Sequence, residues 1–478
     1  MSFSLKKIIS ASVIYSLGDF LSVGVSGLLL IPLYLHYMEP AEYGVYGVVS
    51  TLLLLLSVVM QFGLLSAIAR YFFIYRKTGE HYDFLGSIWL LQTVIGLVLA
   101  VLSAVFMPYF WPVLAPNVSF SPYFWLLLAS ALLSFSAGLY PIWLRNENKA
   151  VPFVALQVAT LGLTLLTAVV FLAVFHLGAM GAVGAMALTA VAQTAISILC
   201  LARVTRWRFR WQLVRAPLVF GFWMASGTLC YVLLSRTQIL ALQQYSDLAT
   251  VGIFNLALQF SGMLMLFGNS FGKAWQPVIY GAADSAEASV IIERTARWWV
   301  AGMLFIAMGL SFFSGDILRL LARREYLTAD AVIRLTVIAS FIYGLTQLPA
   351  AALLYQNRAG LSQVIAVIAA GLNIFFLVIF VPRWQAAGAA WAMICAFTVY
   401  TVLSYLVAQR ILPVRYDWRA LGKILLCGAI IFGLEALYVY GSSGMSAVAV
   451  RALLWVSFPL ALLGLGVLKR PFFLKSTI

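Results

Sequence analysis

Charged and amide side chains within long apolar segments are the residues of this sequence that could do chemistry. Asp19 and Arg236 each lie deep in such a segment, and Thr237 and Gln238 follow Arg236 directly. An ionisable group inside a bilayer is costly, so its presence points to a function by default. An arginine guanidinium donates paired hydrogen bonds to phosphate, which makes it a natural partner of an anionic headgroup. The sequence therefore predicts a polar cavity in the membrane that binds an anionic group.

Polar residues also recur at helical spacing in two further segments. In one, two asparagines, a glutamine and a lysine lie four, ten and four residues apart in order along the chain, which keeps them near one helix face. The other segment carries Gln61 and ends at Arg70. Hydrogen bonds between helices, each worth about 1 kcal/mol, would explain the same residues without a ligand. The candidate substrate-binding residues are Arg236, Lys273, Arg70, Asp19, Gln259, Asn255, Asn269 and Gln61.

The sequence contains no motif of an enzyme, a metal site or a cofactor site. Its three histidines, His36, His81 and His176, are far apart, and its four cysteines stand singly in apolar segments. That distribution gives neither a disulfide framework nor a metal-ligand spacing. Nucleophile elbows, zinc-binding helix motifs, nucleotide loops and dinucleotide fingerprints are also missing. We therefore expect no catalysis, no metal and no cofactor.

The elements that position these side chains are membrane-spanning helices. Hydrophobic residues make up 64% of the 478 residues and charged residues 9%, with a mean hydropathy of +1.01, so polar faces could not cover a soluble surface. A bilayer core about 30 Å thick needs roughly 20 apolar residues per helix. We predict an all-α polytopic membrane protein with about 14 transmembrane helices, near 9–36, 42–69, 85–111, 122–144, 151–175, 181–202, 217–242, 250–274, 296–314, 328–354, 362–381, 387–409, 421–440 and 447–467.

The net charge of +15 would indicate a nucleic-acid partner in a soluble protein, but its distribution here indicates membrane topology. Of the 30 basic residues, 23 fall in loops and helix ends on the side that holds both termini. The opposite side keeps only Arg319, Arg323, Arg324 and Arg383. By the positive-inside rule, the basic side is cytoplasmic. We predict a multi-pass protein with both termini in the cytoplasm and no nucleic-acid partner.

Three groups of residues repeat along the chain at nearly one offset. Two of the groups lie later in each half of the chain, and their copies follow at offsets of 209 and 207 residues. The remaining group lies in the turn after the first predicted helix, and we expect Glu39 and Asp247 to occupy equivalent places on one membrane face. At an offset of 208, Tyr37, Glu39, Ala41 and Gly44 are matched by Tyr245, Asp247, Ala249 and Gly252.

This duplication predicts the domain organisation. Each repeat holds six predicted spans, an even number, so the two repeats have one orientation and are related by an axis along the membrane normal. Substrate sites lie at such repeat interfaces. We predict six-helix lobes at 1–210 and 211–412, and an added two-helix hairpin with a cytoplasmic tail at 413–478.

Two ion pairs follow from the helix assignments. Glu435 and Arg451 lie eight residues on either side of the turn near residue 443, which places them at similar depth on facing helices. The alternative for Arg451 is a side chain that extends alone to the membrane surface. Arg334 follows Asp330 by four residues, which favours a pair along one helix.

One connection between predicted spans is both basic and aromatic. Residues 203–215 read RVTRWRFRWQLVR. Basic side chains at a membrane surface attract anionic lipid headgroups by roughly 1 kcal/mol each. The alternative is a topological anchor in which tryptophans mark the membrane interface.

The turn sequences carry a resemblance to a known family. IPLYLHYMEPAEYGVYGVV and its echo QYSDLATVGIFNLA, together with EYLTADAVIRL and the openings of spans six and twelve, resemble polysaccharide flippases. These form the O-antigen translocase (Wzx-type) branch of the MOP transporter superfamily. The resemblance implies flipping of an undecaprenyl-diphosphate-linked oligosaccharide across the bacterial inner membrane by alternating access between two lobes. It also implies a role in O-antigen, capsule or exopolysaccharide assembly beside a polymerase and a chain-length regulator.

Other functions stay open at this point. A multidrug exporter of the related MATE branch typically has twelve helices and acidic cation sites, whereas this chain has about 14 predicted helices and a cavity richer in bases. A membrane polymerase or ligase of glycan assembly would need a large catalytic loop, which the sequence lacks. A scaffold without transport activity is compatible with the sequence. Coupling of transport to a proton or sodium gradient through Asp19 is a conjecture.

Overall fold

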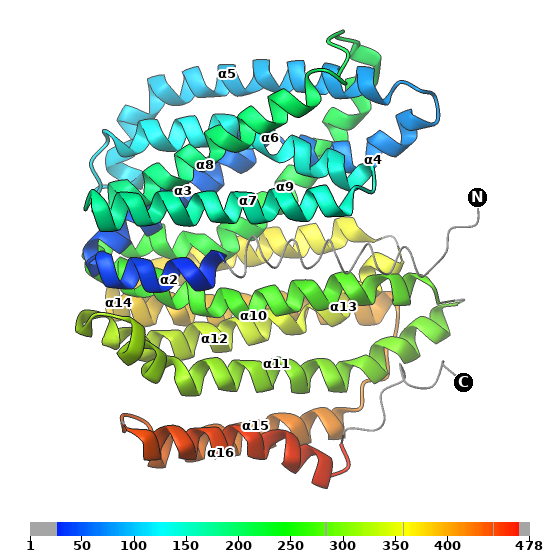
Figure 1. Ribbon diagram of the computed structural model, residues 1–478. Coiled ribbons are helices and arrows are strands. Elements are labelled where there is room, and N and C mark those ends of the chain that lie inside the picture. Colours follow the sequence, from blue (N-terminus) through cyan, green and yellow to red (C-terminus); the bar gives the residue numbers. More distant parts are fainter. Residues whose placement is uncertain (1–25, 283, 357, 443, 468–478) are drawn as a thin grey trace. The chain divides into compact units, whose positions relative to one another are not determined.

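The computed structural model describes residues 26–282, 284–356, 358–442 and 444–467 (Figure 1). Within these ranges the chain is built of helices, and no strand is found there. Two compact units, Met1–Gly252 and Ile253–Ile478, divide the chain within a single helix. Asp19 and most of the first predicted span lie outside the described residues. The predicted lobe boundaries stay a prediction.

The first unit holds α2 to α9 and the first turns of α10. Most of these helices are long and apolar enough to cross a membrane. Their bounds are α2 (Ser26–Tyr37), α3 (Pro40–Gln61), α4 (Leu64–Arg76), α5 (His81–Leu114), α6 (Tyr123–Asn146), α7 (Ala150–Val169) with the π-helical turn η2 (Val170–Val174), α8 (Gly178–Leu201), α9 (Trp211–Tyr245) and α10 (Leu248–Tyr280).

Local sequence explains where α3 begins and why it ends early. Pro40 occupies the first turn, and Glu39 and Glu42 form a capping box in which the Glu39 N–H donates to Glu42 Oε2 at 3.1 Å. After α3, Phe62 and Gly63 adopt left-handed φ angles of +50° and +64°. The predicted span 42–69 is therefore two helices, α3 and α4, with a break that hydropathy does not reveal.

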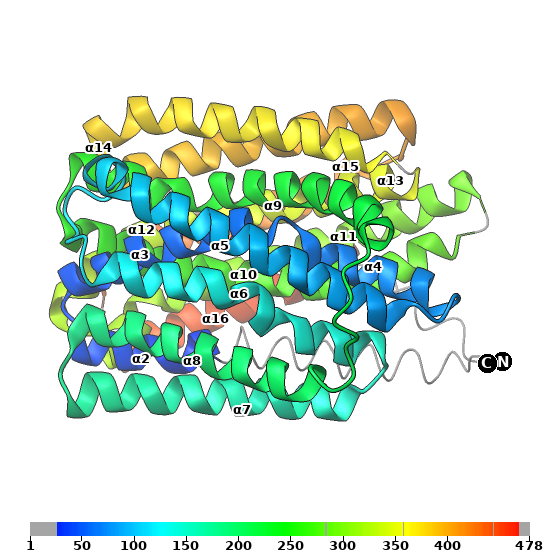
Figure 2. The ribbon, with the colours of Figure 1, turned by 90° about the horizontal axis from the view of Figure 1, so that it is seen from above.

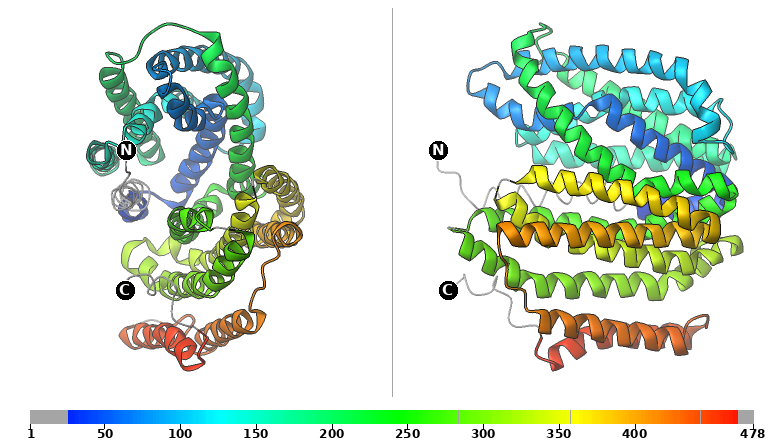
Figure 3. Two further views of the ribbon diagram at one scale, coloured as in Figure 1. Left: turned by 90° about the vertical axis from the view of Figure 1, so that its right-hand side faces the viewer. Right: turned by 180° about the vertical axis from the view of Figure 1, so that it is seen from behind.

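The second unit holds the remainder of α10 and the helices that follow. One of them, α14, has a non-helical conformation at Gln385, with φ +46° and ψ −122°, where two helices meet. Figures 2 and 3 show these two parts of α14 lying side by side. The bounds are α11 (Ser285–Leu321), the 3-10 turn η3 (Arg324–Thr328), α12 (Ala329–Leu345), α13 (Gln347–Tyr355), α14 (Ala359–Ile411), α15 (Trp418–Tyr438) and α16 (Met445–Gly464).

The described residues contain 12 helical segments long and apolar enough to span a membrane. One of them, Gly360–Ile411, covers the two predicted spans 362–381 and 387–409. The predicted all-helical polytopic architecture is therefore confirmed. The count of 14 stays a prediction, because the first predicted span lies mostly outside the described residues.

Apolar side chains are both buried between the helices and exposed on their outer faces. Phe72, Phe84 and Phe153 are fully buried in the core of the first unit. On α5, Val105 and Val113 are 55% and 65% exposed, and other large apolar side chains share this exposure. Exposed apolar side chains of this kind suit hydrocarbon and not water. The chain is a multi-pass membrane protein.

The C-terminal hairpin of α15 and α16 packs against α11. The Trp455 ring stacks on Phe305 with centroids 4.3 Å apart, and its Nε1 donates to the Phe305 carbonyl at 2.8 Å. A Cβ atom at Gly309 would lie 3.1 Å from the Trp455 ring, so glycine lets the indole approach α11 closely. At the start of α15, Asp417 pairs with Arg297 at 3.6 Å.

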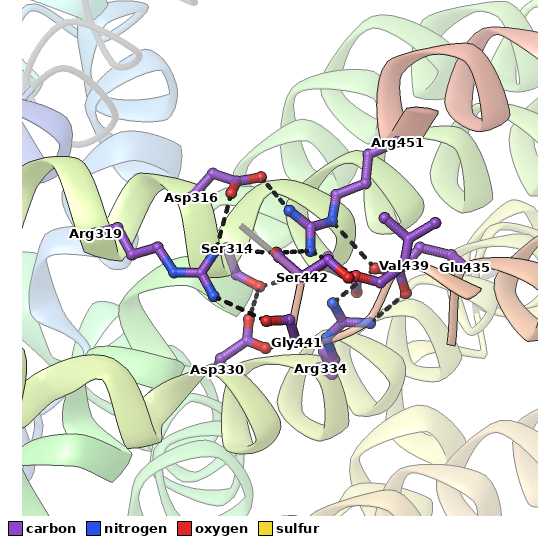
Figure 4. Close-up of polar contacts among 11 residues, drawn as sticks. Ser314, Asp316, Arg319, Asp330, Arg334, Glu435, Val439, Gly441, Ser442 and Arg451 are labelled. Atoms are coloured by element: carbon purple, nitrogen blue, oxygen red, sulfur yellow. Dashed lines mark hydrogen bonds and ion pairs between the residues drawn. The ribbon is translucent and has the colours of Figure 1, made fainter. Parts of the chain in front are cut away.

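Glu435 is the centre of a buried network of charges that joins this hairpin to α11 and α12 (Figure 4). Arg334 donates to both of its carboxylate oxygens, at 2.6 and 3.1 Å. Arg451 Nε lies 3.4 Å from Glu435 Oε1, and Arg451 Nη1 donates to Asp316 at 2.6 Å. The predicted Glu435–Arg451 pair is confirmed, as is the Arg334–Asp330 pair, at 3.4 Å. Buried charges are tolerated when they are paired and hydrogen-bonded in this way.

Candidate functional site

An open groove of about 540 Å³ lies between α4 and α9 in the first unit. The two helices cross closely beside it, since a Cβ atom at Gly63 would lie 2.1 Å from the carbonyl oxygen of Gly221. From that crossing the groove extends toward the helix ends that the positive-inside rule assigns to the cytoplasm. Its lining residues are Tyr71, Gln212, Arg215, Ala216, Val219, Phe220 and Trp223.

The groove is built mainly by one face of α9. Six of its lining residues recur every three or four positions over the first turns of that helix, which is the spacing of side chains that share a helix face. Polar Gln212 and Arg215 lie at the start of the helix, and the aromatic Phe220 and Trp223 lie deeper. The groove therefore has a polar end and an aromatic end.

Arg70 lies at the edge of the groove and contacts its aromatic wall. Its guanidinium carbon is 4.8 Å from the ring centroid of Phe220 and 5.9 Å from that of Tyr71. The two rings pack edge to face at 5.9 Å, so they form a fixed support for the cation. Neither Arg70 nor the exposed Arg215 forms an ion pair among the described residues. Both guanidinium groups are therefore able to bind an anion.

Arg236 lies elsewhere on α9. It follows Arg215 by 21 residues, which is about 31 Å along a helix. It interacts electrostatically with Tyr46 and Tyr231. Tyr46 packs in turn against the Tyr34 ring, with centroids 5.1 Å apart. The structure does not bring Arg236 to the groove.

The other predicted site residues are dispersed. Gln61 donates to Ser134 Oγ at 3.0 Å, a bond between α3 and α6 that suits a structural role. Asn255, in the second unit, is fully buried, and its side-chain amide has no hydrogen-bond partner within the described part of the chain. Gln259 is half-buried in the same helix. Asp19 and the side chains of Asn269 and Lys273 lie outside the described residues, so their predicted roles stay predictions.

The sequence prediction thus includes Arg70 at the edge of the groove and none of the residues that line it. The sequence predicts Arg70 as a site residue, but it places Arg215 in the basic segment 203–215, as a headgroup contact or a topological anchor. Gln212 falls in the same segment, and Phe220 and Trp223 fall inside the predicted span 217–242. The periodicity of Gln212, Arg215, Phe220 and Trp223 on one helix face was the signal that could have grouped them.

A sequence-family match and similarities to solved structures place the chain among known proteins. The sequence model of the family described as polysaccharide biosynthesis protein matches residues 5–281. The fold is similar to that of the lipid II flippase MurJ in an inward closed conformation, with 15% identity, a TM-score of 0.74, and coverage of 95% of this chain and 98% of that chain. It is also similar to an inward-facing multidrug resistance MATE family transporter of the MOP superfamily, with 16% identity, a TM-score of 0.65, and coverage of 86% and 99%. No curated protein sequence shows significant similarity to this chain.

These matches confirm the predicted resemblance to polysaccharide flippases of the MOP superfamily. The family model covers more than half of the sequence and so decides the family. At 15–16% identity, the solved structures establish the fold alone.

Proposed function

The chain belongs to the polysaccharide biosynthesis protein family, and we propose on this premise that it flips a lipid-linked oligosaccharide between membrane leaflets. The substrate class is an oligosaccharide on undecaprenyl diphosphate, used for O-antigen, capsule or exopolysaccharide assembly. The chain would work in the bacterial inner membrane with both termini in the cytoplasm. A polysaccharide polymerase and a chain-length regulator would act on the flipped product. The fold shared with a protein titled lipid II flippase supports this proposal.

The observation that carries the proposal is the meeting of Arg70 and Arg215 at one open groove with aromatic walls. A diphosphate carries the negative charge that two guanidinium groups bind with paired hydrogen bonds. Gln212 supplies an amide that can hydrogen-bond to sugar hydroxyls. Tyr71 and Trp223 offer flat apolar faces on which sugar rings can pack. The groove opens toward the predicted cytoplasmic side, where a lipid-linked precursor would enter.

The same groove argues against a cationic drug as the substrate. Its lining includes an arginine and no carboxylate, and Arg70 at its edge adds a second positive charge. A cation would be repelled by both groups, since like charges in a site of low dielectric raise the binding free energy. The similarity to a multidrug transporter concerns the fold alone.

Flipping can be tested in proteoliposomes. Lipid-linked oligosaccharide extracted from cells that lack the protein would be reconstituted, and its accessibility to an external glycan-cleaving enzyme would be followed over time. We expect wild-type protein to expose the glycan and the Arg70→Gln/Arg215→Gln double variant to do so at least tenfold more slowly. Each hydrogen-bonded charge contributes about 1.5–3 kcal/mol, and 1.4 kcal/mol corresponds to a factor of ten.

The control is Arg324→Gln, which removes an exposed charge from the opposite predicted side. It should leave the flipping rate unchanged. Wild-type vesicles that leave the glycan inaccessible would contradict flipping as the function. Equal flipping rates for wild type and the double variant would show that the groove is not the binding site.

A further inference from the structure

The connection between α8 and α9 is an extended segment fastened to the start of α5. Figure 2 shows it crossing between these helices at their ends. Ser87 Oγ donates to the Arg208 carbonyl at 2.8 Å, and the Arg210 N–H donates to Ser87 Oγ at 3.1 Å. A Cβ atom at Gly86 would lie 2.0 Å from the Arg206 carbonyl oxygen, so glycine permits this close approach. The backbone of residues 206–210 therefore has a fixed path.

Acidic residues at the start of α5 neutralise only part of the positive charge carried by residues 203–210. Arg206 pairs with Asp83 at 3.6 Å, and Arg210 pairs with Glu80 at 2.6 Å. Arg208 lies between them in the sequence, is exposed, and has no acidic partner among the described residues. Arg203, just after α8, is also exposed and has no acidic partner among the described residues. Two positive charges without an acidic partner among the described residues, Arg203 and Arg208, therefore remain on this connection.

Aromatic residues alternate with the arginines along this segment. Trp207, Phe209 and Trp211 are 49%, 51% and 52% exposed. The Trp207 ring lies 5.1 Å from that of Trp89, which is two turns further along α5 than the acidic residues. Trp207 and Phe209 therefore leave about half of their surface exposed directly beside Arg208 in the sequence. Exposed tryptophans next to basic side chains are typical of the membrane interface, where indole rings lie at the level of the headgroups.

We propose that Arg203 and Arg208 form a binding site for an anionic phospholipid headgroup in the predicted cytoplasmic leaflet. The exposed rings of the segment would pack against the glycerol and upper acyl chains of the same lipid. Half-exposed aromatic rings next to unpaired cations complement a molecule that is anionic at one end and apolar at the other. A topological anchor needs positive charge but does not need this fixed geometry. The inference does not depend on the proposed transport function.

Native mass spectrometry of the purified full-length protein tests the site without any glycan substrate. The measured quantity is the affinity of the most tightly bound phosphatidylglycerol relative to phosphatidylcholine. Wild type should prefer phosphatidylglycerol, and Arg203→Gln/Arg208→Gln should lower that preference between about fivefold and thirtyfold. The range follows from about 1 kcal/mol for each basic side chain at an anionic surface. Arg208→Lys keeps the charge and should retain most of the preference.

The matched control is Arg324→Gln/Arg383→Gln, which removes two exposed charges from the predicted opposite side. It should leave the preference unchanged. Thermal unfolding in detergent verifies that each variant is folded, as expected for exposed side chains. The proposal is overturned if wild type shows no preference for the anionic lipid, or if the control lowers it as much as the double variant does.

Discussion

Gly44 and Gly252 face each other where α3 crosses the first turn of α10, at matching positions of the two sequence repeats. A Cβ atom at Gly44 would lie 1.9 Å from the carbonyl oxygen of Leu248, and one at Gly252 would lie 1.9 Å from that of Pro40. The offset of 208 residues relates Gly44 to Gly252 and Pro40 to Leu248. The contact is therefore reciprocal, as a local two-fold axis requires. The turns of Glu39 and Asp247, which precede these helices, lie on the same side, as the repeat predicted.

This crossing predicts that substitution of either glycine by alanine lowers the stability of the protein equally. Gly44→Ala or Gly252→Ala should destabilise the protein by about 1–3 kcal/mol, because a methyl group would overlap a backbone carbonyl and force the helices apart. Thermal unfolding in detergent measures the effect. Gly162→Ala is the control, since a Cβ atom there would meet nothing within 4 Å. Equal tolerance at all three positions would contradict the close crossing.

Because Glu435 is the centre of the buried network, its substitution should strongly lower the stability of the fold. Glu435→Gln would leave Arg334 and Arg451 without their shared carboxylate, and breaking a buried pair costs about 3–5 kcal/mol. We expect a large fall in the midpoint of thermal unfolding. Asp417→Asn is the comparison, because asparagine can keep the helix cap that Asp417 makes with the Ala420 N–H while losing the partly exposed pair. It should cost less than about 1 kcal/mol. Similar losses for both variants would count against the network.

Arginine geometry at the groove gives a prediction for transport. Arg70→Lys keeps the charge but loses the planar group that stacks on Phe220. A stacked cation at an exposed site is worth about 0.5–1 kcal/mol, so the flipping rate should fall about two- to fivefold, less than for Arg70→Gln. The proteoliposome assay measures both. A lysine variant as slow as the glutamine variant would show that the planar guanidinium is required.

Asp247 gives the start of α10 a dependence on pH. Hydrogen bonds from Thr250, including the backbone N–H at 2.9 Å, lower the pKa of this carboxyl below its ordinary value. A carboxyl with a depressed pKa contributes stability that is present above its unfolded pKa and is lost as the pH falls through the folded pKa. Unfolding midpoints measured between pH 7 and pH 3 should therefore fall less in Asp247→Asn than in wild type. An identical acid loss in both proteins would show that this cap does not contribute.

Much of the fold could be predicted because the responsible forces act locally along the chain. A run of about 20 apolar residues is required wherever a helix crosses hydrocarbon, so composition alone indicates the spans. The Glu435–Arg451 pair was predictable because a short turn fixes the register of two antiparallel helices. Arg334 joins Glu435 across 101 residues, and nothing in the local pattern indicates that contact.

The sequence by itself determined the membrane class, most of the spans, the repeat and the family resemblance. The tertiary structure decided which polar residues meet. Arg215 lines the groove and Arg70 lies at its edge, beside the point where Gly63 and Gly221 let α4 and α9 cross almost backbone to backbone. In a bilayer, apolar pattern cannot distinguish a helix face that meets lipid from one that meets another helix, since both are apolar. Helix packing depends there on shape and on single close contacts, which involve residues far apart in the chain.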